Sequence, residues 1–268
     1  MQTITARKIA DALEQIAPLD SGVTGDQQGF IYGDAEKPVR GVACMWCAHS
    51  ASLRRAMERG LDFVIVHEAL FEQPQKSPWY DGPRSAEEIT ANRMRLEVLT
   101  RGQMVVYRIH SSWDALEVDG VPDCAARALK IPGLKEIARQ KYFKVMRLPE
   151  PMTVAALAEH TKTQLCLPSV RTFGDPDKKI SAFAFLVGGF GENQIHMPQA
   201  AAALGAEAIL IGEMSEFVVM NALECQLPVI ETLHSASEIP AIRRQAELLK
   251  ARFPEIPVEY VPSGALNF

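Results

Sequence analysis

The stretch Phe63-Val64-Ile65-Val66-His67-Glu68 decides how the rest of the chain is interpreted. A short run of four apolar residues, rich in β-branched side chains, predicts a strand that is buried in a parallel sheet. An imidazole and a carboxylate follow this run directly, at the carboxyl end of the predicted strand. Because ligands in α/β proteins bind outside the carboxyl ends of strands, His67 and Glu68 are candidates for a functional site.

Two later segments share this arrangement. They are His110-Ser-Ser-Trp-Asp114 and His234-Ser-Ala-Ser-Glu238, and in each of them a histidine that follows an apolar run precedes a carboxylate by four residues. Imidazoles and carboxylates together form the mixed nitrogen and oxygen ligand set that suits Zn, Mn, Fe or Ni. Three such pairs at strand ends predict a site for one or two divalent metal ions, and two bridged ions can generate hydroxide at neutral pH.

Each pair also has a purely structural interpretation. His67 and Glu68 can be a polar strand end that meets solvent, and His110 and Asp114 can be ordinary loop residues. Glu238 can simply favour the positive end of a helix dipole behind a serine cap. The metal hypothesis therefore depends on the joint occurrence of the three pairs.

The composition excludes some classes of function. The chain has 268 residues, of which 47% are hydrophobic and 23% charged, as in an ordinary globular protein. Its net charge of -5 and pI near 5.7 provide no basic field for nucleic acid. No apolar run is long enough to span a membrane, and the N-terminus lacks the apolar core of a signal peptide. Five cysteines without such a signal favour reduced thiols and a cytoplasmic location.

Strand-like and helix-like segments alternate along the chain, which predicts the α/β class with mostly parallel sheets. Glycine-rich residues 20–34 and proline-containing residues 73–85 are expected to be surface loops. We place a junction after residue 131, which gives a first lobe at 1–131 and a second at 132–268. The expected strands are 39–46, 63–66, 104–109, 181–187, 208–211, 229–233 and 258–261, and the expected helices are 3–17, 51–59, 86–101, 124–129, 153–165, 197–204, 216–224 and 237–252.

The two lobes share one local pattern. Residues 56–68 align with residues 201–213, and both segments read as a helix, a glycine, an acidic residue, an apolar strand and then a glutamate. The alignment suggests an internal duplication, although any two βα units share this order of features.

Other motifs carry less weight. Cys44-Met-Trp-Cys47 lacks the second cysteine pair of a zinc knuckle, so packed and reduced thiols are favoured. Gly188-Gly-Phe-Gly191 is similar to a phosphate-binding turn between a strand and a helix. It matches neither the G-x-G-x-x-G motif nor a Walker loop, so a tight turn is the favoured interpretation. We expect His49, His160 and His196 to be surface or structural residues. No serine nucleophile elbow is present.

The order of several short motifs resembles that of the NIF-three-like family, also called dinuclear-metal-centre hexameric proteins or GTP cyclohydrolase I type 2 homologues. In the first half these motifs are Gly60-Leu-Asp-Phe-Val-Ile-Val-His67 and the segment from His110 to Asp114. In the second half they are Leu148-Pro-Glu-Pro-Met-Thr153, Gly174-Asp-Pro-Asp177, Val187-Gly-Gly-Phe-Gly191, Ala208-Ile-Leu-Ile-Gly-Glu213 and His234-Ser-Ala-Ser-Glu238.

The resemblance implies two similar α/β lobes with a metal site in the cleft between them, and a homo-oligomer, namely a hexamer built as a trimer of dimers. It implies that His67, Asp114, His234 and Glu238 are metal ligands and that His110 lies beside the site. Glu68 stands where the family has the second histidine of its His-His pair, so the chain looks like a divergent member of that family. Leu233 and Ser237 also replace the glycine and threonine that are usual in the closing motif.

The leading hypothesis is a metal-dependent hydrolase that acts on a small nucleotide-like or cyclic-amide substrate. Its metal ligands would be His67, Glu68, Asp114, His234 and Glu238, and His110 or Glu213 would shuttle the proton. The first alternative is a non-catalytic metal-binding or metal-delivery scaffold. A second is an interaction protein whose metal site has decayed through Glu68.

Overall fold

The computed structural model describes residues 3–267, and within them the chain folds into two compact units. The first unit contains the chain up to Leu116 and again from Ile242 onward, and the second is Glu117–Ala241. This division differs from the lobes predicted at 1–131 and 132–268. Two long-range features account for the difference, because Ala125 and Leu129 pack in the core of the second unit while the C-terminal segment returns to the first.

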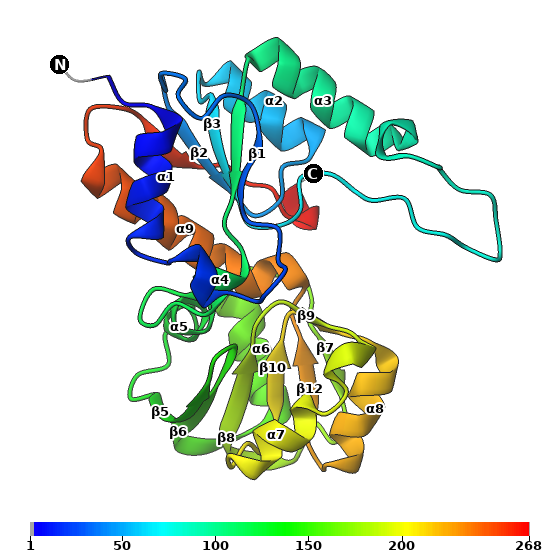
Figure 1. Ribbon diagram of the computed structural model, residues 1–268. Coiled ribbons are helices and arrows are strands. Elements are labelled where there is room, and N and C mark those ends of the chain that lie inside the picture. Colours follow the sequence, from blue (N-terminus) through cyan, green and yellow to red (C-terminus); the bar gives the residue numbers. More distant parts are fainter. Residues whose placement is uncertain (1–2, 268) are drawn as a thin grey trace. The chain divides into compact units, whose positions relative to one another are not determined.

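The first unit is built on a five-stranded sheet of order β1-β4-β3-β2-β13 (Figure 1). Every neighbouring pair in this sheet is parallel except β1 with β4. The strands are β1 (Gly29–Tyr32), β2 (Val42–Met45), β3 (Phe63–Val66), β4 (Val105–Arg108) and β13 (Val258–Tyr260). β2, β3 and β4 are buried along their whole length, as expected for the central strands of a parallel sheet.

Helices cover both faces of this sheet. α2 (Ser50–Glu58) and α3 (Thr90–Gly102) bury Leu53 and Leu99 against Val64 and Val106 on one face. Tyr107, the next residue of β4, points to the other face, where its hydroxyl donates a hydrogen bond to Glu14 at the end of α1 (Ala6–Glu14). Figure 1 shows α1 and the C-terminal part of α9 (His234–Arg252) on that side. The unit also contains η1 (Leu19–Ser21), η2 (Ala86–Glu88), α4 (Ser111–Asp114) and η4 (Ala265–Asn267).

The second unit has a six-stranded mixed sheet of order β5-β6-β8-β10-β12-β7. β8, β10 and β12 form its parallel centre, and the remaining pairs are antiparallel. The strands are β5 (Lys135–Gln140), β6 (Phe143–Thr153), β7 (Arg171–Phe173), β8 (Lys179–Leu186), β10 (Ile209–Ile211) and β12 (Val229–Glu231), and β9 (Gly189–Phe190) pairs separately with β11 (Glu213–Met214).

Two hydrophobic clusters fill the two faces of the second sheet. On one face α5 (Val121–Ala128) and α6 (Val154–Gln164) bury Leu157 against Phe183 and Leu210. On the other face α7 (Met197–Ala203) and α8 (Glu216–Glu224) bury Val218 against Ile211. A short η3 (Glu192–Gln194) precedes α7.

The prediction of an α/β fold is confirmed, but several elements differ from the sequence-based expectation. β1 lies inside the predicted loop at 20–34, and β5, β6 and β7 lie where regular structure was not expected. β6 contains Pro149 and Pro151, which are tolerated because its register with β8 shifts between Arg147 and Met152. The last long helix begins at His234 rather than at residue 237.

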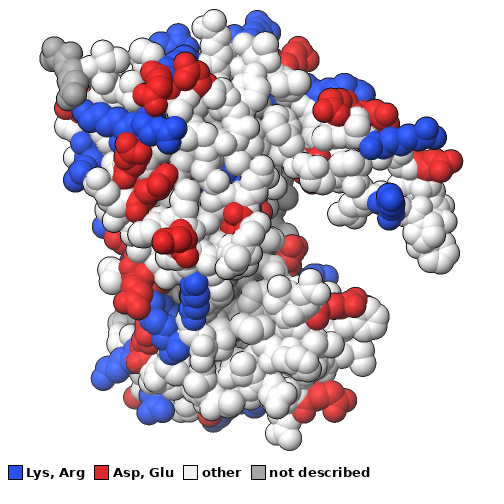
Figure 2. All heavy atoms as spheres, viewed as in Figure 1, with Lys and Arg blue, Asp and Glu red and all other residues white. Residues whose placement is uncertain are grey.

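Among residues 3–267, no helix combines the length and the apolar content that a bilayer crossing requires. On the face of the molecule shown in Figure 2, basic and acidic side chains are interspersed rather than gathered by sign.

We predict that the first sheet loses stability when Asp62, the buried residue before β3, becomes asparagine. Asp62 is 3% exposed and accepts hydrogen bonds from Lys37 and from the backbone and side chain of Arg40. Burial raises the pKa of Asp62, but these bonds outweigh it and leave the pKa below its usual value. We expect Asp62→Asn to lower the free energy of unfolding by about 2 kcal/mol at pH 7, measured by urea denaturation.

The pH dependence provides the check on this prediction. Because the folded-state pKa is depressed, the contribution of Asp62 is present above the unfolded pKa and is lost as the pH falls through the folded value. The difference between wild type and Asp62→Asn should therefore shrink as the pH drops below about 4. A difference that stays constant down to pH 3 would contradict the assignment.

Candidate metal centre

Two parallel strands deliver the candidate donors of the first unit to one edge of its sheet. The register pairs Val66 of β3 with Arg108 of β4, so both strands end at the same level. His67 and Glu68 follow β3 at this edge, and Ile109 and His110 follow β4. The sheet therefore brings His67 next to Ile109, which is 42 positions away in the sequence.

His67 is almost completely buried and has a defined orientation. Its Nδ1 lies 3.3 Å from the carbonyl oxygen of Ile109. Because a carbonyl can only accept a hydrogen bond, Nδ1 carries a proton, and in the neutral imidazole the lone pair is then on Nε2. That Nε2 lies 3.4 Å from Oδ1 of Asp114, the last residue of α4.

The distance of 3.4 Å is informative about the chemistry of this pair. A charge-assisted N–H···O hydrogen bond is shorter, at about 2.7–2.9 Å. Two ligands that each lie about 2.1 Å from one tetrahedral metal ion are instead about 3.4 Å apart. The spacing between His67 and Asp114 is longer than that of a charge-assisted hydrogen bond and is compatible with two ligands of one ion.

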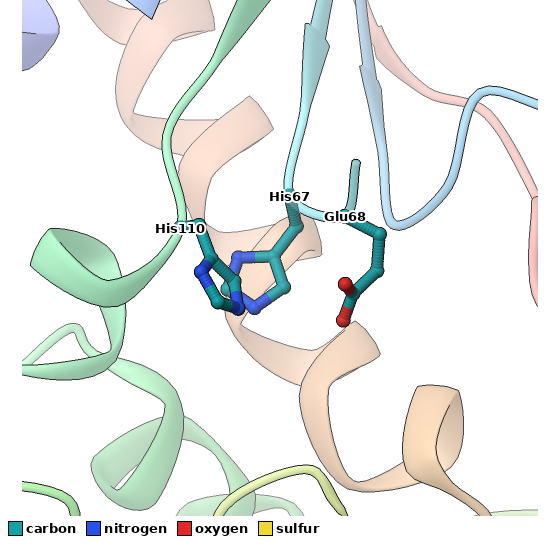
Figure 3. A group of neighbouring side chains, drawn as sticks. All are labelled: His67, Glu68 and His110. Atoms are coloured by element: carbon teal, nitrogen blue, oxygen red, sulfur yellow. The ribbon is translucent and has the colours of Figure 1, made fainter. Parts of the chain in front are cut away.

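His110 and Glu68 extend this donor group. The rings of His67 and His110 meet edge to face with centroids 4.8 Å apart, and the Glu68 carboxylate lies near them (Figure 3). One donor atom each from His67, Glu68 and His110 lies within 4.8 Å of the other two. Nε2 of His110 lies 4.0 Å from Oδ2 of Asp114. The first unit thus groups two imidazoles with the Glu68 carboxylate and places the Asp114 carboxylate beside both imidazoles, and side chains of these types bind divalent ions.

The Asp26 carboxylate accepts hydrogen bonds from His110 and from two residues close to it in the sequence, Ser111 and Arg108. Its Oδ2 accepts hydrogen bonds from Nδ1 of His110 at 2.8 Å and from the hydroxyl and backbone N–H of Ser111. Its Oδ1 accepts a hydrogen bond from Arg108 at 2.6 Å. Burial raises the pKa of Asp26, but the bonds from His110, Ser111 and Arg108 outweigh this and hold the pKa far below its usual range. The carboxylate therefore stays ionised, and sequence analysis gave it no role because it stands alone in an irregular loop.

The second unit carries a donor group of its own. Nδ1 of His234, the first residue of α9, lies 3.0 Å from Oε1 of Glu213. Nε2 of the same ring lies 3.4 Å from Oε1 of Glu238, one helical turn further on. This spacing is likewise compatible with two ligands of one ion. The carboxylate of Glu238 is buried, whereas the side chain of Glu213 is 57% exposed.

Three glycines make room for these side chains. A Cβ on Gly188, whose φ is +54°, would lie 2.2 Å from Oε1 of Glu238 and 2.7 Å from Nε2 of His234. A Cβ on Gly189 would lie 2.9 Å from both Glu213 and His234, and Gly212 is similarly close to His234. The Gly188–Gly191 segment was expected to be a tight turn, and its steric contact with the donor residues could not be read from the sequence.

A pocket of about 390 Å³ opens beside this second donor group. His234, Glu213 and Arg171 are among the residues that line it, and all belong to the second unit. Arg171 also forms an ion pair with the buried carboxylate of Glu231. The volume is that of a small-molecule site, with one cation and one exposed carboxylate at its wall.

The structure thus groups the seven predicted site residues into two sets. His67, Glu68, His110 and Asp114 lie together in the first unit, and Glu213, His234 and Glu238 lie together in the second. Asp26 and the three glycines were missed. Their only sequence signals were an isolated acid in a glycine-rich segment and a glycine cluster next to a strand end.

The remaining histidines and the cysteine pair have structural environments. His49 was expected at the surface or in a structural role; it is buried and caps α2 by accepting a hydrogen bond from the backbone N–H of Ser52. His160 hydrogen-bonds to the carbonyl of Leu129, and His196 is exposed. Cys44 and Cys47 are free thiols, and burial raises the pKa of both, which makes them poor nucleophiles.

Comparison with known proteins gives relatives over most of the chain. A protein of Clostridium acetobutylicum described as a GTP cyclohydrolase 1 type 2 homolog is 23% identical over 251 residues, which cover 90% of this chain and 87% of the relative. A protein of Clostridium perfringens with the same description is 24% identical and covers 95% of this chain and 94% of its own length.

Solved structures show the same fold. A Bacillus cereus protein related to NIF3 superposes with a TM-score of 0.80 at 17% identity, covering 98% of this chain and 97% of the other. Reduced HcgD from Methanocaldococcus jannaschii gives a TM-score of 0.72 at 20% identity, covering 97% of this chain and 100% of the other. The family model described as Duf34/NIF3 (NGG1p interacting factor 3) matches residues 4–264. This chain belongs to the Duf34/NIF3 family.

Proposed function

We propose that this protein binds one or two divalent metal ions and uses them to hydrolyse a small nucleotide-like or cyclic-amide substrate. The observation that carries the proposal is that the imidazoles of His67 and His110 lie beside the carboxylate of Glu68 and beside that of Asp114, at spacings that suit metal ligands. The relatives described as GTP cyclohydrolase 1 type 2 homologs support a small, nucleotide-like substrate.

We propose His67, Glu68, Asp114, His234 and Glu238 as the metal ligands. Each histidine among them has its Nδ1 bound to an acceptor, either the Ile109 carbonyl or Glu213, so that Nε2 is available as a ligand. A divalent ion held by such a set lowers the pKa of bound water and thereby supplies a nucleophile at neutral pH.

Glu213 is the best placed residue to move a proton. Its carboxylate is 57% exposed, lines the pocket of about 390 Å³ and touches Nδ1 of His234. It can therefore accept a proton from the pocket and hold it beside an imidazole. Arg171 on the same wall can orient an anionic group of the substrate.

A non-catalytic metal-binding or metal-delivery scaffold is the alternative, and one observation favours it. His110 faces the same donor group as His67 and Glu68, so protein side chains alone can fill the coordination positions of an ion. A site with no open position would store or transfer metal rather than activate water. The cytoplasmic location and the hexamer remain predictions, the first from composition and the second from the family resemblance.

The first prediction concerns metal content. Protein purified without chelators or affinity metal should carry close to one or two equivalents of a divalent metal by elemental analysis. His67→Ala and His234→Ala should each lower the metal content, because each deletes a proposed nitrogen ligand. His196→Ala, a change at an exposed histidine, should leave the content unchanged. Full metal content in both ligand variants would contradict the proposal.

The second prediction concerns the glycine at the second donor group. Gly188→Ala should abolish the metal that depends on His234, because the added Cβ would overlap the tips of Glu238 and His234. Gly205→Ala is the matched control, since Gly205 also has a positive φ, +89°, but has no atom within 4 Å of the added Cβ. Both variants carry a similar backbone strain of about 1 kcal/mol, so only the clash distinguishes them. Equal metal content in the two would refute this steric role.

The third prediction separates the enzyme from the scaffold. Metal-loaded protein, screened against nucleotides and cyclic amides by product chromatography, should show turnover that disappears after metal removal and returns when the metal is restored. Glu213→Gln should lower kcat by about 100-fold while leaving the metal content intact, because the amide cannot accept a proton. Turnover that persists in metal-stripped His234→Ala would rule out the metal-dependent mechanism. Full metal content without any turnover would support the scaffold.

A further inference from the structure

The contact between Asp26 and His110 indicates a metal ligand that the proposed set does not include. We infer that His110 binds the metal through its Nε2 and that Asp26, on the loop before β1, is the residue that positions it. This inference rests on the proposed metal binding, and it assigns His110 as a ligand in place of the proton-shuttle role predicted from the sequence.

The hydrogen bonds around Asp26 determine which nitrogen of His110 carries the proton. The guanidinium of Arg108 and the N–H and hydroxyl of Ser111 all donate to this carboxylate. Asp26 is therefore an acceptor toward every neighbour, and Nδ1 of His110, 2.8 Å from Oδ2, must donate as well. In the neutral imidazole, a proton on Nδ1 leaves the lone pair on Nε2, and this is the tautomer that binds a metal through Nε2.

The direction of that lone pair is toward the donor group. Nε2 of His110 is the ring nitrogen on the Asp114 side, 4.0 Å from Oδ2, and its ring packs edge to face on His67. Ligands of one octahedral or tetrahedral ion lie about 3–4.2 Å apart, so the present position needs only a small shift to complete a shared site. An imidazole backed by a carboxylate is also a stronger donor than one backed by a carbonyl, such as His67.

The loop that carries Asp26 fits closely around the start of α4. The side-chain oxygen of Gln28 accepts hydrogen bonds from the backbone N–H of His110 and from Ser112. A Cβ on Gly22 would lie 2.5 Å from the hydroxyl of Ser111, which itself accepts a hydrogen bond from the N–H of Val23. Residues 22–28 therefore fix the helix that has His110 at its beginning and Asp114 at its end.

The competing interpretation is that Asp26 only neutralises Arg108 and caps Ser111. It predicts a loss of stability in a variant but no change at the imidazole. Asp26→Asn distinguishes the two cases, because an amide cannot accept from all of these donors. Its NH₂ must face either Arg108, which can only donate, or His110, which can become an acceptor by moving its proton to Nε2.

The experiment is ¹⁵N NMR of the histidine side chains in the full chain, first without metal and then during titration with Zn²⁺. His110→Gln assigns the signals of this ring, and a chelator competition gives the Zn²⁺ affinity of each variant. Asp62→Asn is the control, because Asp62 is also a carboxylate that accepts hydrogen bonds from basic residues, Lys37 and Arg40, but lies at the opposite end of β3.

We expect the metal-free wild type to show His110 protonated at Nδ1, and its Nε2 signal to move to that of a metal-bound nitrogen when Zn²⁺ is added. Asp26→Asn should shift the metal-free tautomer toward Nε2–H and weaken Zn²⁺ binding by about 10-fold to 100-fold. Asp62→Asn should leave the tautomer and the affinity unchanged. His110→Gln should weaken binding at least as much as Asp26→Asn.

Three results would contradict the inference, and they can be told apart. If Zn²⁺ shifts His67 but the Nε2 signal of His110 keeps its unbound value at saturation, metal binding stands and His110 is not a ligand. If no histidine signal responds to Zn²⁺ in the wild type, the proposed function fails and the inference fails with it. An unchanged tautomer and affinity in Asp26→Asn would return Asp26 to a purely structural role.

Discussion

The parallel register between β3 and β4 is the constraint on which the first donor group depends. Because Val66 pairs with Arg108, the two strands end level and their next residues share one edge of the sheet. A slip of one residue would turn every side chain to the opposite face and would separate His67 from His110. The side chains of β3 and β4 are buried on both faces, so a slip in register would require the packing on both faces of the sheet to change.

The three site histidines share one hydrogen-bonding pattern. Nδ1 of each ring is bound to an acceptor, which is a backbone carbonyl for His67, Asp26 for His110 and Glu213 for His234. In every case Nε2 is therefore the nitrogen that faces a carboxylate. Such hydrogen bonds orient metal-binding histidines and raise the basicity of the ligand nitrogen. The acceptors therefore affect how strongly each ring can bind a metal as well as where it points. It occurs in both compact units, which supports metal binding as the common purpose of the two sets.

The sequence predicted the parts of the fold that depend on local pattern. The apolar runs of β2, β3, β4 and β8 gave strands, and the structure places a histidine close to a carboxylate in each unit, whereas the assignment of these residues as metal ligands stays a prediction. β1 was missed because its glycine-rich surroundings resemble a loop. β6 was missed because Pro149 and Pro151 argue against a strand unless a register shift accommodates them.

Features that depend on contacts between distant parts of the chain could not be predicted from local sequence patterns. The pairing of β13 with β2 returns the chain end to the first unit, and no local periodicity reports that pairing. Asp26 is a single acid in an irregular segment, and its importance appears only when four donors are seen around it. The same holds for Gly188, whose role depends on side chains that lie 46 and 50 positions later in the chain.

X-ray absorption at the edge of the bound metal tests the central claim most directly, because it reports the atoms around the ion. The account predicts a mixed shell of nitrogen and oxygen at about 2.0–2.2 Å, with the outer-shell scattering that is typical of imidazole rings. A shell of oxygen atoms alone would contradict it, since that result would place the ion on carboxylates and water away from His67, His110 and His234.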